Sequence, residues 1–379
     1  MRFLYAICPL VLLCAACRPA AVMQLTAEAL PAIAPQTDYG KGVSAAAAGE
    51  IDGVLLIAGG ANFPGIPAAE GGSKRFYDDI FILPEGAREW SRAGLLPEAS
   101  AYGAVFQLGD RIVVAGGANE SGSLNGVVEL TMVESHCGDE CCDGLDGIFV
   151  VVSSMPPLPV AIEQAAAAHD GRMLYIAGGL SGGVPSTGVY RCDMESPSRV
   201  WEKIAELPEP MVQPVAALFG GRLWVWGGFD PVRKEACDYG YSYCGGQWRR
   251  VAGLPDGGTA VGSAAVQDAE GRLWIAGGVN REIFNGALNL DAGSVAEYQS
   301  QPVEWYRFRR QMIFFDCESE RWHTAGESAA AARAGAAVVL SRRRGAVILN
   351  GELKPGIRSA EVNALQIAEL NGTMMRSIR

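Results

Sequence analysis

The sequence is short of basic residues, of histidine and of long apolar runs. Its 379 residues carry 31 Lys and Arg against 42 Asp and Glu, which gives a formal net charge of -11, and the basic residues form no long run. Nucleic acid and anionic membrane surfaces are therefore poor candidate partners. The three histidines are His136, His169 and His323. They exclude a copper oxidase site, because His169 falls in a predicted hairpin and His323 in a predicted outer strand.

The longest apolar stretch lies at the N-terminus and is too short for a membrane-spanning helix. Residues 1–16 combine a basic second residue, this stretch and small residues before Cys17, which is the order of a secretory signal peptide. Ala15-Ala16-Cys17 resembles a bacterial lipoprotein cleavage site, although Cys14 stands where an aliphatic residue is commoner. We expect export to the periplasm or cell envelope, with lipid anchoring at Cys17 and simple secretion both open.

Seven of the ten cysteines follow the signal region, and exported chains can keep disulfides. Cys237 and Cys244 flank a Tyr- and Gly-rich segment, which predicts a local bridge across a hairpin. Cys192 and Cys317 fall in third-strand positions and are expected to be small core residues. The segment from His136 to Cys142 offers one imidazole and three thiolates, enough for zinc, but no second ligand pair follows. A loop disulfide is the favoured alternative there, so no metal or other cofactor is expected.

Six short apolar runs each end in a glycine turn, which is the pattern of a repeat protein. Each run reads as a buried strand entering a turn that favours glycine. A second strand follows each turn and, in most repeats, a tryptophan segment, so each unit offers four strands. The six runs are LLIAGG (55–60), IVVAGG (112–117), LYIAGG (174–179), LWVWGG (223–228), LWIAGG (273–278) and VILNG (347–351), and the tryptophan segments cover 88–97, 199–208, 247–255 and 321–327.

The spacing of the turns predicts an all-β, six-bladed kelch-type β-propeller with four strands per blade. Successive turns lie 57, 62, 49, 50 and 73 residues apart, near the roughly 50 residues of kelch repeats. The sixth unit lacks a tryptophan strand, and Met23–Pro31 resembles Trp201–Pro208, so we expect an N-terminal strand to complete the last blade. The expected blades are 43–97, 101–159, 161–208, 212–255, 259–327 and 333–368 plus the strand 22–31, in one domain over 17–370 with a tail over 371–379.

Polar residues directly after the glycine turns are the first candidates for a site, because these turns converge on the propeller axis. Asparagines such as Asn62 and Asn119 also suit turns for purely structural reasons. Glu352, Lys354 and Arg358 lie within seven residues, and a Pro-Gly turn between them can direct all three heads to one spot. A surface salt-bridge loop is the competing interpretation. The fifth repeat adds Asn280, Arg281 and Glu282.

The fifth repeat is also stretched, with about thirty residues between Gly278 and the strand 311–316. A long excursion from a rigid scaffold is usually functional. Aromatic planes with guanidinium groups suit a sugar acid, since rings cover the apolar sugar face and arginine binds carboxylate. An aromatic plug packed between blades is the alternative. The residues concerned are Phe284, Tyr298, Trp305, Tyr306, Arg307, Phe308, Arg309 and Arg310.

Four segments carry a family resemblance: GGANFPG, GGVNREIFNGAL, PVEWYRFRRQMIFFD and NGELKPGIRSAEV. They resemble the cyclically permuted mutarotases, the kelch family that includes the bacterial N-acetylneuraminate epimerases, and the resemblance covers nearly all of the mature chain. It implies an exported isomerase that interconverts the α and β anomers of sialic acid. It also implies that Glu352 is the proton acceptor, that Arg358 is the loop arginine, and that Asn280–Glu282 face the same mouth. Asn350 in place of a glycine and the insertion around Cys137 depart from the family pattern.

The chemistry of anomerisation needs no redox cofactor or metal. A carboxylate such as Glu352 can take the proton of the anomeric hydroxyl, while Lys354 or Arg358 stabilises charge at the ring oxygen or holds the substrate carboxylate. Asn62, Asn280, Arg281, Glu282 and Arg307 are the predicted substrate-binding residues. A sialidase is excluded, because its repeated Ser-x-Asp-x-Gly-x-Thr-Trp turns are absent. A non-catalytic glycan- or protein-binding kelch module remains the rival, and the sequence does not indicate an oligomeric state.

Overall fold

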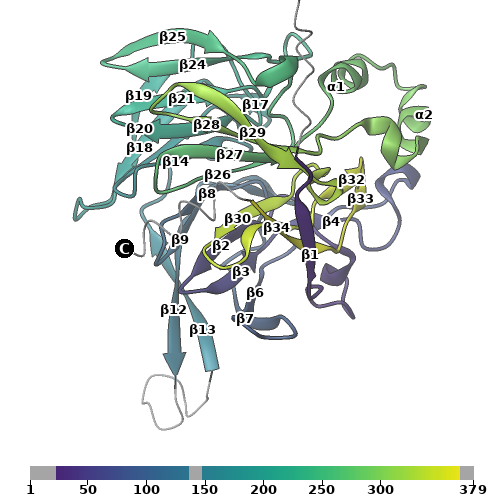
Figure 1. The fold of residues 1–379 in the computed structure, drawn as a ribbon. Helices are drawn as coiled ribbons and strands as arrows, with labels where there is room; N and C mark the ends of the chain where they lie inside the picture. Colours follow the sequence, from purple (N-terminus) through teal and green to yellow (C-terminus); the bar gives the residue numbers. More distant parts are fainter. Residues whose placement is uncertain (1–22, 136–146, 368–379) are drawn as a thin grey trace, which may run out of the picture.

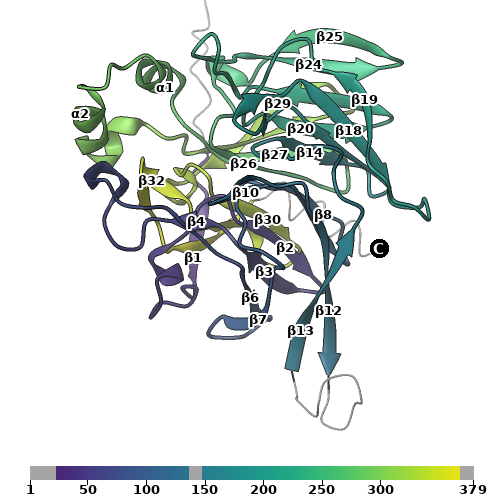
Figure 2. The same cartoon turned by 180° about the vertical axis from the view of Figure 1, so that it is seen from behind.

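The glycine turns end the second strands of six four-stranded antiparallel sheets, which stand around a common axis in a computed structural model (Figures 1 and 2). The structure describes residues 23–135 and 147–367. The predicted six-bladed propeller is thereby confirmed. The first three blades contain β2 (Ala47–Ile51), β3 (Val54–Ala58), β6 (Asp79–Leu83) and β7 (Ser91–Leu95); β8 (Ala104–Gln107), β9 (Ile112–Ala115), β12 (Val127–Ser135) and β13 (Gly147–Met155); and β14 (Ala166–His169), β15 (Met173–Ala177), β18 (Gly188–Asp193) and β19 (Glu202–Glu206).

The remaining blades follow the same order, and the last takes its outer strand from the N-terminus. They contain β20 (Val215–Phe219), β21 (Arg222–Trp226), β24 (Tyr239–Cys244) and β25 (Gln247–Ala252); β26 (Ser263–Gln267), β27 (Arg272–Gly277), β28 (Gln311–Asp316) and β29 (Arg321–Glu327); and β30 (Ala337–Ser341), β31 (Gly345–Leu349), β34 (Val362–Gln366) and β1 (Thr26–Leu30).

Strand β1 closes the ring as the sequence predicts. It pairs antiparallel with β34, in a register that runs from Thr26 opposite Gln366 to Leu30 opposite Val362. The indole of Trp90 in the first blade donates a hydrogen bond of 2.8 Å to the carbonyl of Pro31. The N-terminal segment thus joins the sixth blade to the first, and the sixth sheet gains the outer strand that its C-terminal part lacks.

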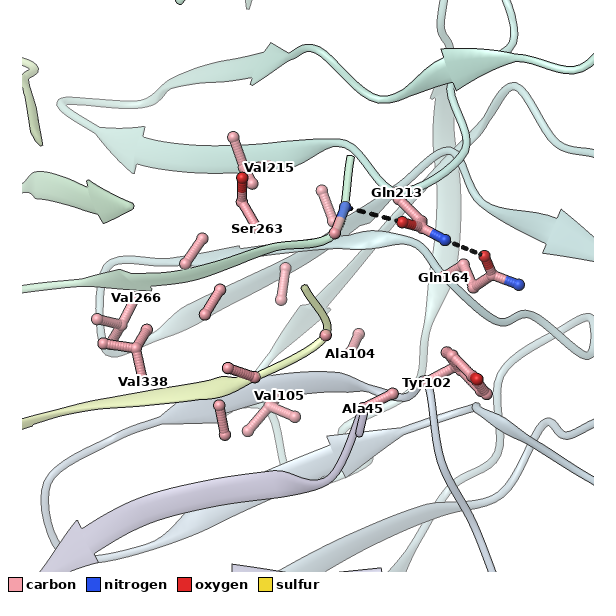
Figure 3. Close-up of a pocket in the computed structure, with 18 of the residues that line it drawn as sticks. Ala45, Tyr102, Ala104, Val105, Gln164, Gln213, Val215, Ser263, Val266 and Val338 are labelled. Carbon is pink, nitrogen blue, oxygen red and sulfur yellow. Dashed lines mark hydrogen bonds between the residues drawn. The ribbon is translucent and has the colours of Figure 1, made fainter. Parts of the chain in front are cut away.

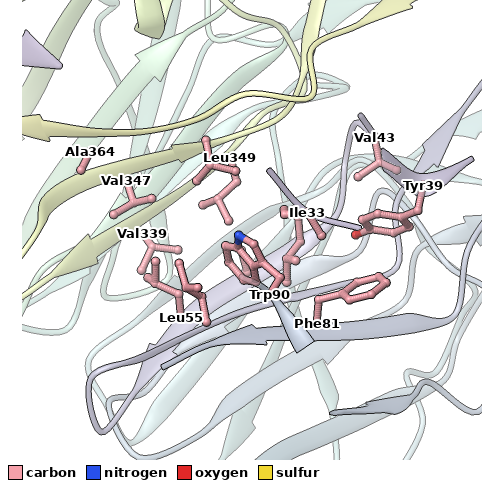
Figure 4. Close-up of a cluster of buried hydrophobic side chains, with 14 of the residues drawn as sticks. Ile33, Tyr39, Val43, Leu55, Phe81, Trp90, Val339, Val347, Leu349 and Ala364 are labelled. Atoms are coloured by element: carbon pink, nitrogen blue, oxygen red, sulfur yellow. The ribbon is translucent and has the colours of Figure 1, made fainter. Parts of the chain in front are cut away.

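Each pair of neighbouring blades shares one cluster of buried apolar side chains, so the core consists of six small interfaces arranged in a ring. The alternating apolar residues of each strand face the next blade on both sides, which is why the strands read as continuous apolar runs. Figure 4 shows the interface between the sixth and first blades, where Leu349 and Val339 meet Leu55 and Trp90. Burial of Tyr39 in this cluster raises the pKa of its phenol far above the ordinary value.

Between their second and third strands, five blades carry a small β-hairpin at one end of the propeller, and the fifth carries helices instead. Both views place helix α2 beside β32 and β4 at this end (Figures 1 and 2). The hairpins are β4 (Ala61–Asn62) with β5 (Arg75–Phe76), β10 (Ala118–Asn119) with β11 (Gly122–Ser123), β16 (Leu180–Ser181) with β17 (Val184–Pro185), β22 (Phe229–Asp230) with β23 (Glu235–Ala236), and β32 (Glu352–Lys354) with β33 (Ile357–Arg358); the helices are α1 (Arg281–Leu288), α2 (Val295–Ser300) and the 3-10 turn Val303–Tyr306.

Other 3-10 turns are confined to connections, at Tyr39–Lys41, Ala68–Glu70, Pro255–Gly257 and Ala329–Ala331.

The glycine turns are required by close packing between blades as well as by backbone conformation. Gly277, the last residue of β27, has φ +66°, and a Cβ atom there would lie 2.2 Å from the carbonyl oxygen of Arg333 in the next blade. The neighbouring Gly278 N–H donates to that same carbonyl at 2.8 Å. Only glycine leaves room for this hydrogen bond between blades.

The predicted bridge between Cys237 and Cys244 is wrong, because both thiols are free. Cys244 is the last residue of β24, and Cys237 lies two residues before the first residue of that strand. The two cysteines therefore stand at opposite ends of one extended segment. Seven residues of strand span about 23 Å, and a disulfide needs Cα atoms closer than about 7 Å. Cys192 and Cys317 are buried core residues, as expected. The cluster from Cys137 to Cys142 lies outside the described residues.

Candidate active site

Six residues in the left-handed conformation, one just before the first strand of each blade, form a closed ring of hydrogen bonds around the axis. In five of the six steps, a backbone N–H donates to the backbone carbonyl of the previous blade at 2.7 to 2.9 Å. In the remaining step, the N–H of Gly262 donates to the side-chain oxygen of Gln213 at 2.9 Å, and the amide nitrogen of Gln213 donates to Gln164 at 2.7 Å (Figure 3). The ring members are Ala45, Tyr102, Gln164, Gln213, Gly262 and Gly335.

This ring borders a cavity of about 360 Å³ on the propeller axis. Its walls come from the first strands of the blades and are mostly Ala and Val. Polar side chains line both ends, near the ring and at Gln107, His169 and Gln267, where three of these strands end. Figure 3 shows Tyr102, Gln164 and Gln213 on one side of the cavity, with Val266 and Val338 deeper in it. The size matches sites for small ligands, which occupy about 300 to 1,000 Å³.

Glu352 lines this cavity and occupies a position that is apolar in the equivalent hairpins. Its backbone pairs with Ala334 through bonds of 2.6 and 3.0 Å, just as a residue beside the ring pairs with the hairpin in other blades. Asn350, two residues before Glu352, stands where the other repeats have the first glycine of the turn. Its φ is +53°, a conformation that asparagine tolerates, so the turn stays intact. A charged residue has therefore replaced a small or apolar one at the mouth. The equivalent residues are Ala61, Ala118, Leu180 and Phe229.

Arg358 forms an ion pair with Glu352, as the spacing of the loop suggests. The Arg358 side chain is only 4% exposed, whereas that of Glu352 is 26% exposed, toward the cavity. Arg358 also donates to the carbonyl of Ala61 at 3.4 Å and lies 5.5 Å from the centre of the Phe63 ring. Glu352 of the sixth blade is thus paired with an arginine that contacts Ala61 and Phe63 of the first blade.

Burial raises the pKa of Glu352 above its ordinary value of 4.5. The nearby charge of Arg358, the backbone N–H of Gly356, the charge of Lys74 and the hydrogen bond from Arg358 oppose this effect without cancelling it. A carboxylate of this kind is a stronger base than a free glutamate and still ionises. It therefore suits a role as a general base.

The head of Lys354 points to the helical excursion and not to Glu352. Its ammonium donates to the backbone carbonyls of Gln299 at 3.2 Å and Gln301 at 2.9 Å, at the end of α2. The three charged heads of the loop therefore do not meet at one spot. The catalytic role predicted for Lys354 stays a prediction, and its contacts are those of an anchor for the segment around α2.

Asn62 and Arg307, two of the predicted substrate-binding residues, lie in different surroundings. Asn62 is 1% exposed, donates to the carbonyls of Asp38 and Gly42 at 2.9 Å each, and accepts from Tyr77. All of these contacts support the first hairpin. Arg307 is exposed and has φ +49° at the end of its 3-10 turn. Their binding roles stay predictions.

The three residues at the start of α1 diverge. Asn280 caps the helix by accepting from the N–H of Ile283 at 3.1 Å. Arg281 pairs with Asp238 of the fourth blade, and Glu282 is exposed. Asn280 alone of the three lines a cavity, a smaller one of about 110 Å³ that adjoins the axial cavity and shares Glu352 with it.

The aromatic residues of the fifth blade form a cluster beside this smaller cavity. The Tyr306 ring lies 5.4 Å from Tyr298 and 5.2 Å from Trp305, and only 1% of Tyr306 is exposed. Tyr298 faces Glu352, and burial, Tyr306 and Glu352 together raise its pKa to about 12. Tyr306 is buried as the packing interpretation expects, and it lines the smaller cavity together with Tyr298 and Phe284, whose sugar-binding role stays a prediction.

Arg309, from the same segment, is used inside the fold. It donates to the carbonyls of Thr259 at 2.9 Å and Gly277 at 3.3 Å, and burial lowers its pKa to about 10.

Two residues that the sequence did not single out also reach the mouth. The ammonium of Lys74, just before β5, donates to the hydroxyl of Tyr102 at 3.0 Å, and Tyr102 is a member of the ring. Lys74 belongs to the first blade and Glu352 to the last, and 278 residues separate them in the chain. Only the closure of the ring brings them together, so no local motif signals the pair.

Within residues 23–135 and 147–367, no three His, Cys, Asp or Glu side chains gather in an arrangement suited to a metal ion. Among the same residues, no helix has the length and apolar character needed to cross a membrane. The signal region, Cys17 and the His136–Cys142 segment lie outside the part of the chain that the structure describes.

These features define the class of the protein: a six-bladed propeller whose axial mouth holds a glutamate paired with a buried arginine. A family model described as N-acetylneuraminate epimerase matches residues 21–136 and 155–376. The chain therefore belongs to the N-acetylneuraminate epimerase family, and the family prediction made from the loop motifs is confirmed.

Individual relatives match over a little more than half of their length. The N-acetylneuraminate epimerase of Haemophilus influenzae (strain 86-028NP) is 33% identical over 224 residues, 55% of this chain and 58% of the relative. The enzyme of that name from Pasteurella multocida is 32% identical over 220 residues, 54% and 56% of the two chains. A solved structure titled "Structure of YjhT" is 27% identical with a TM-score of 0.48, over 56% of this chain and 67% of the other. The chain thus spans less than two thirds of the curated relatives named here.

Proposed function

We propose that the protein is a sialic acid mutarotase, an isomerase that interconverts the α and β anomers of N-acetylneuraminate. Membership of the family supports this function, and so do the relatives that carry the name N-acetylneuraminate epimerase. The observation that carries the proposal is Glu352: a base of raised pKa at the mouth of a cavity large enough for a sugar, where the other hairpins have apolar residues.

The reaction follows from the chemistry of a cyclic 2-keto sugar. Glu352 takes the proton of the anomeric hydroxyl while a water molecule delivers a proton to the ring oxygen and recovers it on closure. The bond from the anomeric carbon to the ring oxygen breaks, and the open keto form results. Rotation about the bond next to the carbonyl presents its other face to the ring hydroxyl. Closure then returns the proton from Glu352 to the new anomeric oxygen, and the ring hydroxyl loses its own proton. No atom is gained or lost.

Arg358 serves this chemistry as a fixed partner of the base. Its side chain is buried and bonded to Glu352 and to Ala61, so it holds one carboxylate oxygen and leaves the other toward the cavity. A cation in this position also keeps Glu352 partly ionised despite its burial.

Exchange between the anomers, followed by proton NMR exchange spectroscopy of N-acetylneuraminate with and without protein, tests the function. General base catalysis is worth about 10²- to 10⁴-fold, so Glu352→Gln should lose most of the acceleration. Glutamine keeps an oxygen for Arg358, which protects the fold. Glu318→Gln is the matched control, because Glu318 is exposed at the opposite end of the fifth blade.

Two results would refute the function. One is a folded wild-type protein that exchanges the anomers no faster than buffer does. The other is a Glu352→Gln variant with the full wild-type rate. Binding of the sugar without any gain in rate would instead identify a glycan-binding module.

We infer that the protein acts in the periplasm or cell envelope. The signal-like segment 1–16 supports export, and Cys17 after two alanines supports a lipid anchor. Mass spectrometry of the protein purified from membranes tests both points. A diacylglyceryl-modified N-terminal Cys17 is the expected result, and an intact Met1 in the mature protein would contradict export.

A further inference from the structure

Lys74 is a second cation at the mouth, in addition to Arg358. Its ammonium lies 5.1 Å from the centre of the Tyr102 ring and 5.9 Å from the centres of the Phe63 and Phe76 rings. Arg358 lies over the same Phe63 ring at 5.5 Å. Phe63 therefore holds the two cations close to each other and to Glu352, whose pKa is lowered by the charge of Lys74.

The three cations of this region differ in what they already bind. Arg358 is buried and paired with Glu352, and Lys354 is bonded to two backbone carbonyls. Lys74 is exposed, and among the described residues it forms no ion pair within 4.0 Å. Of the three, Lys74 is therefore the exposed cation that is neither paired with a carboxylate nor bonded to backbone carbonyls.

Tyr102 complements Lys74. Because the Tyr102 oxygen accepts from the lysine, its own hydrogen is left to donate, and the residue lines the axial cavity (Figure 3). An ammonium and a hydroxyl side by side offer two hydrogen-bond donors to one carboxylate. Two acidic side chains reach the hairpin that follows Lys74: Glu120 of the second blade accepts from the backbone N–H of Phe76 at 3.2 Å, and Asp38 pairs with Arg75 at 3.3 Å.

The local charge of Lys74, Arg358 and Glu352 is +1, in a chain whose net charge is -11. A positive spot within an acidic protein attracts an anion to one place only. We propose that Lys74 and Tyr102 form an anion subsite that binds the carboxylate of a sugar acid. This inference rests on the proposed function for the identity of the ligand, and it assigns the substrate carboxylate to residues other than Lys354 and Arg358.

The assignment has a geometric consequence for the reaction. In a 2-keto sugar acid the carboxylate and the anomeric hydroxyl are attached to the same carbon. A carboxylate bound between Lys74 and Tyr102 therefore keeps the anomeric oxygen at the Glu352 side of the mouth. Lys74 and Tyr102 then determine which oxygen of the sugar Glu352 deprotonates.

Calorimetric titration with N-acetylneuraminate and with its methyl ester, which has no carboxylate charge, tests the subsite. The wild-type protein should bind the acid about 10- to 100-fold more tightly than the ester, the range for hydrogen bonds to a charged group. Lys74→Met should reduce the affinity for the acid to that for the ester and leave the ester unchanged. Lys74→Arg should restore part of the preference, and Tyr102→Phe should lose a smaller part. Lys203→Met, on an outer strand of the third blade, is the matched control.

The proposal is overturned if Lys74→Met weakens the acid and the ester equally, if it leaves the acid unchanged, or if the folded wild-type protein binds neither at millimolar concentration. Circular dichroism checks that each variant is folded. The same titrations separate this inference from the proposed function. An acid preference that depends on Lys74, without faster anomer exchange, removes the mutarotase activity and keeps the subsite. Faster anomer exchange that is insensitive to Lys74→Met keeps the mutarotase activity and removes the subsite.

Discussion

Gly277→Ala is expected to damage both the fold and the site, because Gly277 lies where the fifth blade meets the backbone that supports Glu352. A Cβ atom at this position would lie 2.2 Å from the carbonyl oxygen of Arg333. Arg333 directly precedes Ala334, whose backbone pairs with Glu352. Any shift that relieves the overlap therefore moves the residue that holds the hairpin of Glu352.

The expected cost has three parts. A left-handed conformation costs a non-glycine residue about 1–2 kcal/mol. Overlap with a backbone atom that cannot rotate away costs about 1–3 kcal/mol, as in overpacked cores. Weakening of the hydrogen bond from Gly278 to Arg333 costs about 0.5–1.5 kcal/mol. The variant should thus lose roughly 3–6 kcal/mol, a large share of the about 5–15 kcal/mol of a typical folded domain.

Gly109→Ala is the matched control, since it makes the same chemical change at φ +89° where a Cβ atom meets nothing within 4 Å. It should cost only the conformational part, about 1–2 kcal/mol. Denaturant unfolding followed by tryptophan fluorescence gives both values from the midpoints, and anomer exchange gives the effect on the site. Equal stability losses in the two variants, or full activity in Gly277→Ala, would show that close packing between blades does not govern this turn.

Three further predictions concern the mouth. Glu352 acts as a base only when it is ionised, and its pKa is raised above 4.5. The catalysed rate should therefore fall as the pH drops, with a midpoint above pH 4.5. A midpoint at or below pH 4.5 in a rate–pH profile would contradict this assignment. Lys354→Met should speed amide hydrogen exchange of residues 295–301, because the two hydrogen bonds from its ammonium to carbonyls of this segment are lost. It should slow the interconversion of anomers less than Glu352→Gln does. Equal slowing by the two variants would make Lys354 catalytic. Gln213→Ala should lower the unfolding free energy by about 1–3 kcal/mol, because it leaves the N–H of Gly262 without its acceptor and the side-chain oxygen of Gln164 without its donor. Denaturant unfolding measures this loss, and an unchanged midpoint would contradict it.

The repeat pattern predicts the architecture because each blade is built from local segments. An apolar run ending in glycine describes a strand and its turn, and six of them define six blades. The closing strand is also visible, since Met23–Pro31 carries an outer-strand pattern that the last blade lacks, and β1 forms there. What the repeats do not predict is the hydrogen-bonded ring at the axis, because Ala45, Tyr102 and Gln164 share a backbone conformation and not a residue type.

The failed disulfide shows where local spacing misleads. Cys237 and Cys244 were expected to face each other across a turn, yet the residues between them extend as one strand whose partner is β25. The turn lies after Cys244, at Gly245 and Gly246, so the two thiols cannot approach. The spacing of two cysteines does not indicate whether the chain between them folds back.

The Glu352–Arg358 ion pair follows from the sequence, whereas the catalytic and binding roles of the site residues stay predictions. Glu352 and Arg358 share one hairpin, so the family motif was enough to find them, and their pairing is local. Lys354 has the same spacing, but its direction depends on the helical excursion of another blade. Lys74 and Tyr102 come from the first two blades, and their approach to Glu352 depends on the diameter of the ring.

The location of the site at the seam of the propeller ties its geometry to ring closure. Glu352 and Arg358 belong to the last blade, whereas Phe63, Lys74 and the carbonyl that Arg358 binds belong to the first. These two blades are held together by one buried cluster and by the N-terminal strand β1, which pairs with the last blade while Pro31 bonds to Trp90 of the first. Because the base and the anion subsite lie on opposite sides of this seam, a change in blade spacing there alters the distance between them directly. At the interfaces that run from the second blade through the third, fourth and fifth to the sixth, the same change would leave Glu352, Lys74 and Tyr102 on one side and their separation nearly intact.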